Sequence, residues 1–165
     1  MSGNAATARA TGADDATRRA KNLEVIKKFL GYTEGGPGST RTQDKAKLYY
    51  GEGSYYKIPF YLEGKHTEFL GLDAINKQED INASNFARWE FRIKEIIECA
   101  DPDKFWLKIH GVGTLIAGGA MKQEMTLSPM LLFFQMKEGK ILGWEEYFNP
   151  LAMYAQAGVK VPSLY

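Results

Sequence analysis

Residues 141–148 read Ile-Leu-Gly-Trp-Glu-Glu-Tyr-Phe and lie directly before the Asn149-Pro150 break. They follow the polar turn Lys137-Glu-Gly-Lys140, so the pattern predicts the return strand of a hairpin. At the two-residue period of a strand, one face of this segment carries Leu142, Trp144, Glu146 and Phe148. Three of these side chains are large and apolar, and the fourth is a carboxylate.

Glu146 is the leading candidate for chemistry, because a strand face that buries Trp and Phe tends to turn this carboxylate inward as well. Desolvation raises the pKa of a carboxyl group, and a general acid or base near neutral pH needs such a raised pKa. The alternative is that Glu145 points inward and Glu146 is exposed. The face that carries Glu145 is less bulky, so the parity of the strand favours Glu146.

The rest of the chain predicts helices first and a run of strands afterwards. Helical spacing of apolar residues covers Arg18–Gly31, and shorter helices are expected over Thr42–Tyr50 and Asp73–Ser84. The expected strands are 54–62, 67–70, 89–98, 104–117, 125–136 and 141–148, and Asn149 begins a last short helix over 151–157. This order predicts an α+β fold. A curved antiparallel sheet packs on the N-terminal helices and forms a cone with a pocket at its open end.

The composition is that of an ordinary globular domain. The 165 residues, of which 44% are hydrophobic and 25% charged, predict one domain over residues 18–165. Met1–Thr17 holds little to bury and is expected to be a disordered tail. A net charge of +1 argues against a nucleic-acid partner, and no apolar run reaches membrane-spanning length. The single Cys99 excludes an intrachain disulfide framework and favours a cytoplasmic location.

Two amides and two histidines are the other polar candidates. Gln78 and Asn82 lie four residues apart on the predicted helix over 73–84, so both can meet a polar ligand if that helix closes the pocket; a solvated helix face is the alternative. His66 lies in a polar turn, where a solvated imidazole is expected. His110 lies on a strand from which it could reach a pocket, although a surface or core histidine is the expectation. Neither histidine has a partner spaced for metal binding, so no metal site is predicted.

Four segments of the chain together resemble the PhzA/PhzB proteins of phenazine biosynthesis. They are DPDKFWLKIHGVGTLI (Asp101–Ile116), KEGKI (Lys137–Ile141), EEYFNP (Glu145–Pro150) and AGVKVP (Ala157–Pro162). These proteins belong to the larger group with the ketosteroid-isomerase or nuclear-transport-factor-2 fold, here called NTF2-like. The resemblance covers residues 22–162. Its C-terminal half is the more specific part, whereas the first hairpin is longer than the family's.

This resemblance implies a cone-shaped α+β fold, a homodimer, and a deep pocket that works without metal or organic cofactor. Active family members are thought to join two amino-oxo-cyclohexene carboxylate molecules through two amine-to-ketone condensations. Their acid/base Glu maps onto Glu146, in agreement with the strand parity. Their His on the helix before the long strands maps onto Gln78, and a nearby Ser maps onto Asn82. Glutamine cannot exchange a proton near neutral pH, although it can hold an oxygen or an amine in place.

We therefore predict a cofactor-independent acid/base enzyme of secondary metabolism that acts on a cyclic amino-ketone or carboxylate in a condensation or cyclisation. Glu146 and Gln78 are the expected catalytic residues, and His110 is the candidate to replace the missing His. The expected substrate-binding residues are Asn82, Trp144, Phe148, Tyr56 and, facing a substrate carboxylate, Arg41, Lys45 or Lys47. One alternative is a non-catalytic module that holds a ligand or pairs with a paralogue. Another is an isomerase or dehydratase of this fold that acts on a different ring.

Overall fold

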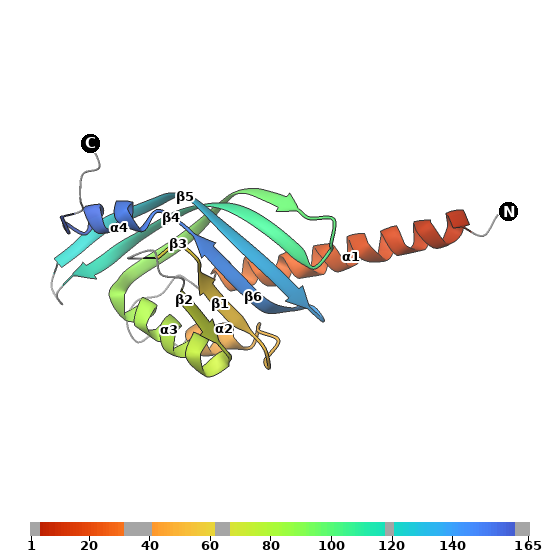
Figure 1. Ribbon diagram of the computed structural model, residues 1–165, viewed down its shortest axis with the longest axis horizontal. Coiled ribbons are helices and arrows are strands. Elements are labelled where there is room, and N and C mark those ends of the chain that lie inside the picture. Colours follow the sequence, from red (N-terminus) through yellow and green to blue (C-terminus); the bar gives the residue numbers. More distant parts are fainter. Residues whose placement is uncertain (1–3, 32–40, 62–66, 118–120, 161–165) are drawn as a thin grey trace.

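The computed structural model describes residues 4–31, 41–61, 67–117 and 121–160, which form one curved six-stranded sheet with helices packed against it (Figure 1). The helices are α1 (Asn4–Gly31), α2 (Arg41–Ala46), α3 (Leu72–Asn85) and α4 (Pro150–Gln156). The strands are β1 (Tyr55–Ile58), β2 (Thr67–Leu70), β3 (Phe86–Glu98), β4 (Lys104–Ala117), β5 (Met121–Lys137) and β6 (Lys140–Tyr147). The predicted order of elements, helices first and long strands afterwards, is confirmed.

The strands lie in the order β2-β1-β6-β5-β4-β3. All neighbours pair antiparallel except β1 and β6, which are parallel, with Tyr56 opposite Trp144. The prediction of a purely antiparallel sheet is therefore wrong at this one pair. The chain between β1 and β6 passes through α3 and three long strands, so β6 arrives from the same end as β1. This pairing matters for function because it sets Tyr56 beside the strand that carries Glu146.

Glycines on β4 allow the sheet to curve around a large side chain. The register of β4 against β5 shifts between Ile109 and Gly111, where β5 has one more residue than β4 and the ladder is locally irregular. A Cβ at Gly113 would lie 2.2 Å from the Trp89 ring, and one at Gly111 would lie 2.8 Å from the same ring. Trp89 can therefore lie flat on β4 only because these two positions lack side chains. Gly143 of β6 likewise makes room for a ring, because a Cβ there would lie 2.3 Å from Tyr55.

The core lies between α1 and the long strands. Phe29 of α1 is fully buried and makes edge-on ring contacts with Tyr49, Phe134 and Trp144. These contacts fix α1 against β5 and β6. Edge-to-face aromatic pairs of this kind stabilise a fold beyond the area that they bury. The same contacts hold Trp144, and therefore β6, in place next to the pocket.

Residues 4–17 are helical, where the composition predicts a disordered tail. In Figure 1, α1 runs well past the edge of the sheet toward the N-terminus. Arg18 forms an ion pair with Asp103, and Asn22 donates to the Pro102 carbonyl at 3.1 Å, so the second half of the helix is docked. Alanine has the highest helix propensity, and a helix extends readily from a docked turn because its nucleus already exists. The alanine-rich segment therefore continues the helix.

Two further predicted boundaries are wrong. The helix expected over Thr42–Tyr50 ends at Ala46, because Tyr49 bridges to Ile141 and its neighbour Tyr50 donates to the Ile141 carbonyl at 2.8 Å. The strand expected over residues 54–62 ends at Ile58, one residue before a proline that has no N–H to donate. The predicted turn over residues 63–66, including His66, lies outside the described residues.

Candidate active site

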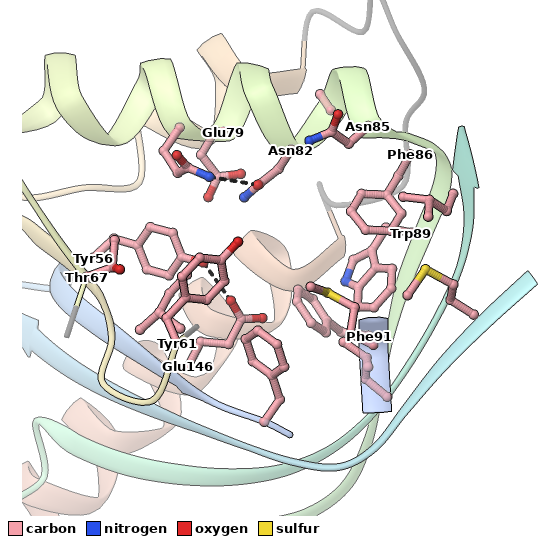
Figure 2. Close-up of a pocket in the computed structure, with 18 of the residues that line it drawn as sticks. Tyr56, Tyr61, Thr67, Glu79, Asn82, Asn85, Phe86, Trp89, Phe91 and Glu146 are labelled. Carbon is pink, nitrogen blue, oxygen red and sulfur yellow. Dashed lines mark hydrogen bonds between the residues drawn. The ribbon is translucent and has the colours of Figure 1, made fainter. Parts of the chain in front are cut away.

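A pocket of about 450 Å³ lies between α3 and the inner side of the sheet (Figure 2). This volume falls in the usual range of sites for small molecules. Side chains from α3, from β1, β2, β3 and β6 and from α4 line it. The polar members are Lys45, Tyr56, Tyr61, Thr67, Gln78, Glu79, Asn82, Asn85, Tyr154 and Glu146. Most of the remaining lining residues are apolar or aromatic.

Glu146 projects from β6 into this pocket and is 9% exposed. The burial agrees with the strand parity, while Glu145 points to the opposite face and accepts a hydrogen bond from Tyr147 there. The Tyr56 hydroxyl donates to Glu146 Oε2 at 2.6 Å. Tyr56 is itself held by Trp144, whose ring stacks on it at 4.3 Å between centroids and 6° between planes. The carboxylate is therefore oriented by a donor that cannot move freely.

Burial raises the pKa of the Glu146 carboxyl from 4.5 to about 7. The hydrogen bond from Tyr56 lowers this pKa, the charge of Glu79 raises it, and the charge of Lys45 lowers it. Burial and the neighbouring Glu146 carboxylate raise the pKa of Tyr56 well above its usual value, so this hydroxyl keeps its proton. A carboxyl group with a pKa near 7 is present in both protonation states at neutral pH. Such a group can both give and take protons.

The pocket also contains a buried ion pair. Lys45 Nζ lies 2.7 Å from Glu79 Oε2, and the two side chains are 5% and 12% exposed. The ammonium also lies 4.2 Å from the centre of the Phe29 ring and 5.6 Å from that of Trp144. The other oxygen of Glu79, Oε1, is buried without a hydrogen-bond partner. The Lys45 ammonium is therefore tightly packed, whereas the Glu79 carboxylate keeps one oxygen without a hydrogen-bond partner.

Two amides of α3 face the pocket and bind each other. Gln78 Nε2 donates to Asn82 Oδ1 at 2.9 Å, as the four-residue spacing on the predicted helix allows. Figure 2 shows Glu79, Asn82 and Asn85 extending from α3 on one side of the cavity, with Glu146 on the other. A ligand in the cavity thus meets amides on one side and an acid on the other.

Aromatic rings form two walls of the cavity. On one side Phe69, Tyr56 and Trp144 stack in a row. On the other side, Trp89 of β3 packs against Phe86 at 4.9 Å and edge-on against Phe91 at 5.7 Å. Both walls belong to the lining of the same pocket. Flat, apolar walls of this kind fit a ring-shaped ligand.

The structure brings most of the sequence-predicted site residues together. The lining includes Glu146, Gln78, Asn82, Trp144, Phe148, Tyr56 and Lys45. The Arg41 side chain lies outside the described part of the chain. His110 pairs with Arg92 across β4 and β3 and is not among the lining residues, because the neighbouring Ile109 is the one that turns into the core. His110 therefore lies outside the pocket.

Sequence reasoning missed Glu79 as a pocket residue. One signal was available: Glu79 follows Ile75 by four residues, and Ile75 is fully buried, so both lie on the inner side of α3. The contact with Lys45 joins residues 34 positions apart and leaves no local pattern. The aromatic wall of Trp89 and Phe91 was also missed. Their strand carries bulky residues on both faces, so its pattern does not indicate which face lines the pocket.

Two kinds of feature are absent from the residues that the structure describes. Within residues 4–31, 41–61, 67–117 and 121–160, no three His, Cys, Asp or Glu side chains are grouped so that they could hold a metal ion. No helix in that part of the chain has the length and apolar character needed to span a membrane.

Comparison with known proteins then places the chain. Residues 5–165 match the sequence model of the family described as Phenazine biosynthesis protein A/B. The chain belongs to this family. It is similar to phenazine biosynthesis protein PhzA1 of Pseudomonas aeruginosa, with 25% identity over 101 residues. That match covers 61% of this chain and 62% of the relative, which is less than two thirds of the relative's length.

Solved structures show the same fold. A phenazine biosynthesis-related protein of Pseudomonas aeruginosa has a TM-score of 0.79 at 22% identity, over 93% of this chain and 95% of that chain. A protein with a ketosteroid isomerase-like fold from Catenulispora acidiphila has a TM-score of 0.65 at 13% identity, over 84% of this chain and 98% of that chain. At these identities the likeness concerns the fold alone. The NTF2-like α+β fold predicted from the sequence is confirmed.

Proposed function

We propose that this family member is a cofactor-independent acid/base enzyme of secondary metabolism, which acts on a cyclic amino-ketone in a condensation or cyclisation. The observation that carries this proposal is Glu146, a carboxyl group held by Tyr56 in an aromatic pocket, with a pKa raised to about 7. A structural carboxylate would gain nothing from such burial, because desolvation penalises its charged form. A proton-transfer group needs it.

The proposed chemistry joins an amine to a ketone and releases water. The amine nitrogen attacks the carbonyl carbon while Glu146 gives a proton to the carbonyl oxygen and takes one back from the nitrogen. The resulting carbinolamine then loses its hydroxyl group and a second proton of the nitrogen. Protonated Glu146 gives its proton to the leaving hydroxyl, and the carboxylate so formed takes the proton from the nitrogen. Glu146 thus ends the cycle as it began, and the proton balance closes without another titrating group.

The amides and rings position the substrate in this proposal. Gln78 cannot serve as a second proton shuttle, but with Asn82 it offers hydrogen bonds to a carbonyl oxygen or an amine. Trp144 and Phe148, with Tyr56, bound the space for the ring. Holding both reacting groups in contact lowers the entropic part of the barrier. We expect this positioning to supply much of the acceleration, since a single acid/base residue contributes about 10²–10⁴-fold.

A product assay tests the proposal. Purified protein is mixed with a freshly generated cyclic amino-ketone, and the condensed ring product is followed by mass spectrometry beside a sample without protein. We expect faster product formation with the protein, lost in Glu146→Gln and kept in Glu145→Gln, which alters the opposite face of the same strand. A rate equal to that of the protein-free sample would remove the condensation proposal.

A second candidate function is a module that binds a ring-shaped ligand, or pairs with an active paralogue, without chemistry. The observation that favours it is the mutual hydrogen bond of Gln78 and Asn82, two amides that cannot exchange protons near neutral pH. The resemblance to the family implies a His and a Ser at these two positions in active members. Such a module would bind the amino-ketone or its product with equal affinity in the wild type and in Glu146→Gln, and would form no product. An isomerase or dehydratase acting on another ring would instead lose turnover of that ring in Glu146→Gln.

We also propose that the protein is a homodimer that meets small molecules in its pocket. The support is an aromatic cluster on the outer side of the sheet, away from the pocket. Trp106 contacts Phe133 and Tyr147, with ring centroids 5.0 and 5.4 Å away, and the adjacent Leu131 is 40% exposed. Clustered exposed apolar side chains are typical of protein–protein interfaces. A cytoplasmic location stays a prediction from the single cysteine.

A further inference from the structure

The Lys45–Glu79 pair bears on what the pocket recognises, a question that the proposed function leaves open. Among the lining residues that the structure describes, Lys45 is the only cation, whereas Glu79 and Glu146 are both acids. Lys45 is one of the basic residues expected from the sequence to meet a substrate carboxylate. Its ammonium, however, already lies 2.7 Å from Glu79 Oε2 and against the Phe29 ring.

A ligand carboxylate would have to compete with Glu79 for this ammonium. The Lys45 and Glu79 side chains are 5% and 12% exposed, so neither can turn to bulk water. Displacing Glu79 would leave its carboxylate buried and unpaired, which is strongly destabilising. Binding an anion beside the intact pair gains little, because the charge of the ammonium is already balanced. The pair therefore opposes a carboxylate at this point.

The same pair favours a hydrogen-bond donor. Glu79 Oε1 is a buried acceptor without a partner, and such an atom carries the full penalty of its lost hydration. Across the cavity, the Tyr56 hydroxyl binds Oε2 of Glu146, which leaves Oε1 of that carboxyl for a ligand. An N–H group beside Glu146 would meet the Oε1 atom of that carboxyl, whereas Glu79 Oε1 has almost no surface open to the cavity, so a donor would reach it only after a shift of that side chain. Hydrogen bonds to ionised groups are the stronger kind.

We infer that the pocket recognises a flat ring by an amine or another N–H donor, with the neutralised Lys45–Glu79 pair as the selecting element, and not by a carboxylate. The inference rests on the proposed function, because it concerns the substrate of the same pocket. The aromatic walls accept the ring, and the acids accept its N–H. A carboxylate on the substrate gains no partner from Lys45.

Three probes of one shape test this inference without turnover: aminonaphthalene, naphthoate and naphthalene, with binding followed by fluorescence. The first carries a neutral amine at neutral pH, the second a carboxylate and the third neither group. In the wild type we expect aminonaphthalene to bind about tenfold more tightly than naphthalene, the gain typical of one hydrogen bond to a charged group. Naphthoate should bind no more tightly than naphthalene.

Substitution of the pair supplies the internal control. In Glu79→Gln the advantage of the amine should shrink severalfold, and naphthoate should gain affinity because Lys45 is now unpaired. The double variant Lys45→Gln/Glu79→Gln holds no unpaired buried charge, so it avoids the folding cost of the single change. It should show neither the full amine advantage nor the naphthoate gain. Circular dichroism verifies that each variant is folded.

Two outcomes would overturn the inference. One is a wild type that binds naphthoate more tightly than naphthalene and loses this advantage in the double variant, which would make Lys45 a carboxylate site. The other is equal binding of all three probes. The condensation assay is separate: absence of product leaves the amine preference standing, whereas product formation with a preference for naphthoate overturns this inference alone.

Discussion

At the scale of single residues, Glu146 combines features that favour opposite protonation states. Burial raises the pKa of its carboxyl, while the Tyr56 hydroxyl at 2.6 Å and the charge of Lys45 lower it. The result, a pKa of about 7, lies between the extremes that either influence alone would produce. The residue is therefore sensitive to changes in its neighbours, and this sensitivity can be measured.

The raised pKa predicts a specific dependence of stability on pH. The pKa of Glu146 has its usual value of 4.5 in the unfolded chain and is raised to about 7 in the folded chain. Between pH 4.5 and 7, the folded state therefore holds a proton that the unfolded state has released. Stability contributed by this group is complete below pH 4.5 and is lost as the pH rises through 7. The loss is about 3 kcal/mol.

Denaturant unfolding from pH 4 to 8 measures this loss, with Glu146→Gln as the reference because Gln does not titrate there. The free energy of unfolding of the wild type should fall relative to that of the variant across this interval. Parallel curves for the two proteins would show that Glu146 titrates normally.

Tyr56→Phe should move the pH profile of activity to higher pH. Its hydroxyl group lowers the pKa of Glu146 by donating to the ionised form, so removing it raises that pKa further. The measurement is the rate of condensation as a function of pH. Tyr55→Phe is the matched control, because the Tyr55 hydroxyl donates a hydrogen bond to Gln135 Oε1 at 3.2 Å and has no hydrogen bond to Glu146. A shift to lower pH in Tyr56→Phe would contradict the assignment.

At the scale of elements, β4 and β3 shape the cavity through a close approach. Trp89 lies over Gly113, where a Cβ would be 2.2 Å from its ring and 2.8 Å from the Arg88 carbonyl oxygen. The backbone oxygen cannot give way as a flexible side chain can. A methyl group at this position must therefore push Trp89 toward the pocket that it lines.

Gly113→Ala should lower the free energy of unfolding by about 1–3 kcal/mol and weaken the binding of naphthalene, because the displaced Trp89 fills ligand space. Chemical denaturation and fluorescence titration measure the two effects. Gly12→Ala in the exposed part of α1 is the control: nothing lies within 4 Å of its Cβ, so it should leave binding unchanged. The free energy of unfolding of Gly12→Ala should rise by up to about 1 kcal/mol. Unchanged binding in Gly113→Ala would show that Trp89 does not bound the site.

Sequence patterns predict elements well where a single period dominates. The β6 segment has its bulkier residues on the face of Trp144 and Phe148, so its parity places Glu146 inward, and the structure agrees. The Asn149 cap is likewise local: its side chain accepts from the N–H groups of Leu151 and Ala152, and α4 begins at the next residue. Patterns fail where long-range packing decides. The parallel β1–β6 pair and the Lys45–Glu79 contact both depend on how distant segments meet, which no local period records.

At the scale of the whole molecule, the two sides of the sheet differ in character. Its inner side holds the pocket, and its outer side carries the cluster of Trp106, Phe133 and Tyr147. Adjacent residues of β5 alternate between these sides, with Met130 fully buried and Leu131 40% exposed. From residue types alone, a binding role could be predicted only for the inner side. Apolar residues on the outer side do not indicate which molecule would cover them.

If the outer cluster forms the dimer interface, one charged substitution within it should separate the two subunits. Leu131→Glu should convert the dimer to a monomer, since an unpaired carboxylate at an apolar interface must be desolvated. Light scattering coupled to size-exclusion chromatography measures the mass. Leu151→Glu, at a similarly exposed leucine of α4, should remain dimeric. A wild type that is monomeric at all concentrations would contradict the proposed homodimer.

The central claim is that this pocket poises Glu146 for proton transfer near neutral pH, and its most direct test is a titration of that one carboxyl group. Carbon NMR of protein labelled at glutamate side chains, with Glu146→Gln to assign the signal, reports its midpoint. We predict a midpoint near 7 in the wild type. A midpoint near 4.5, the ordinary value for glutamate, would contradict it.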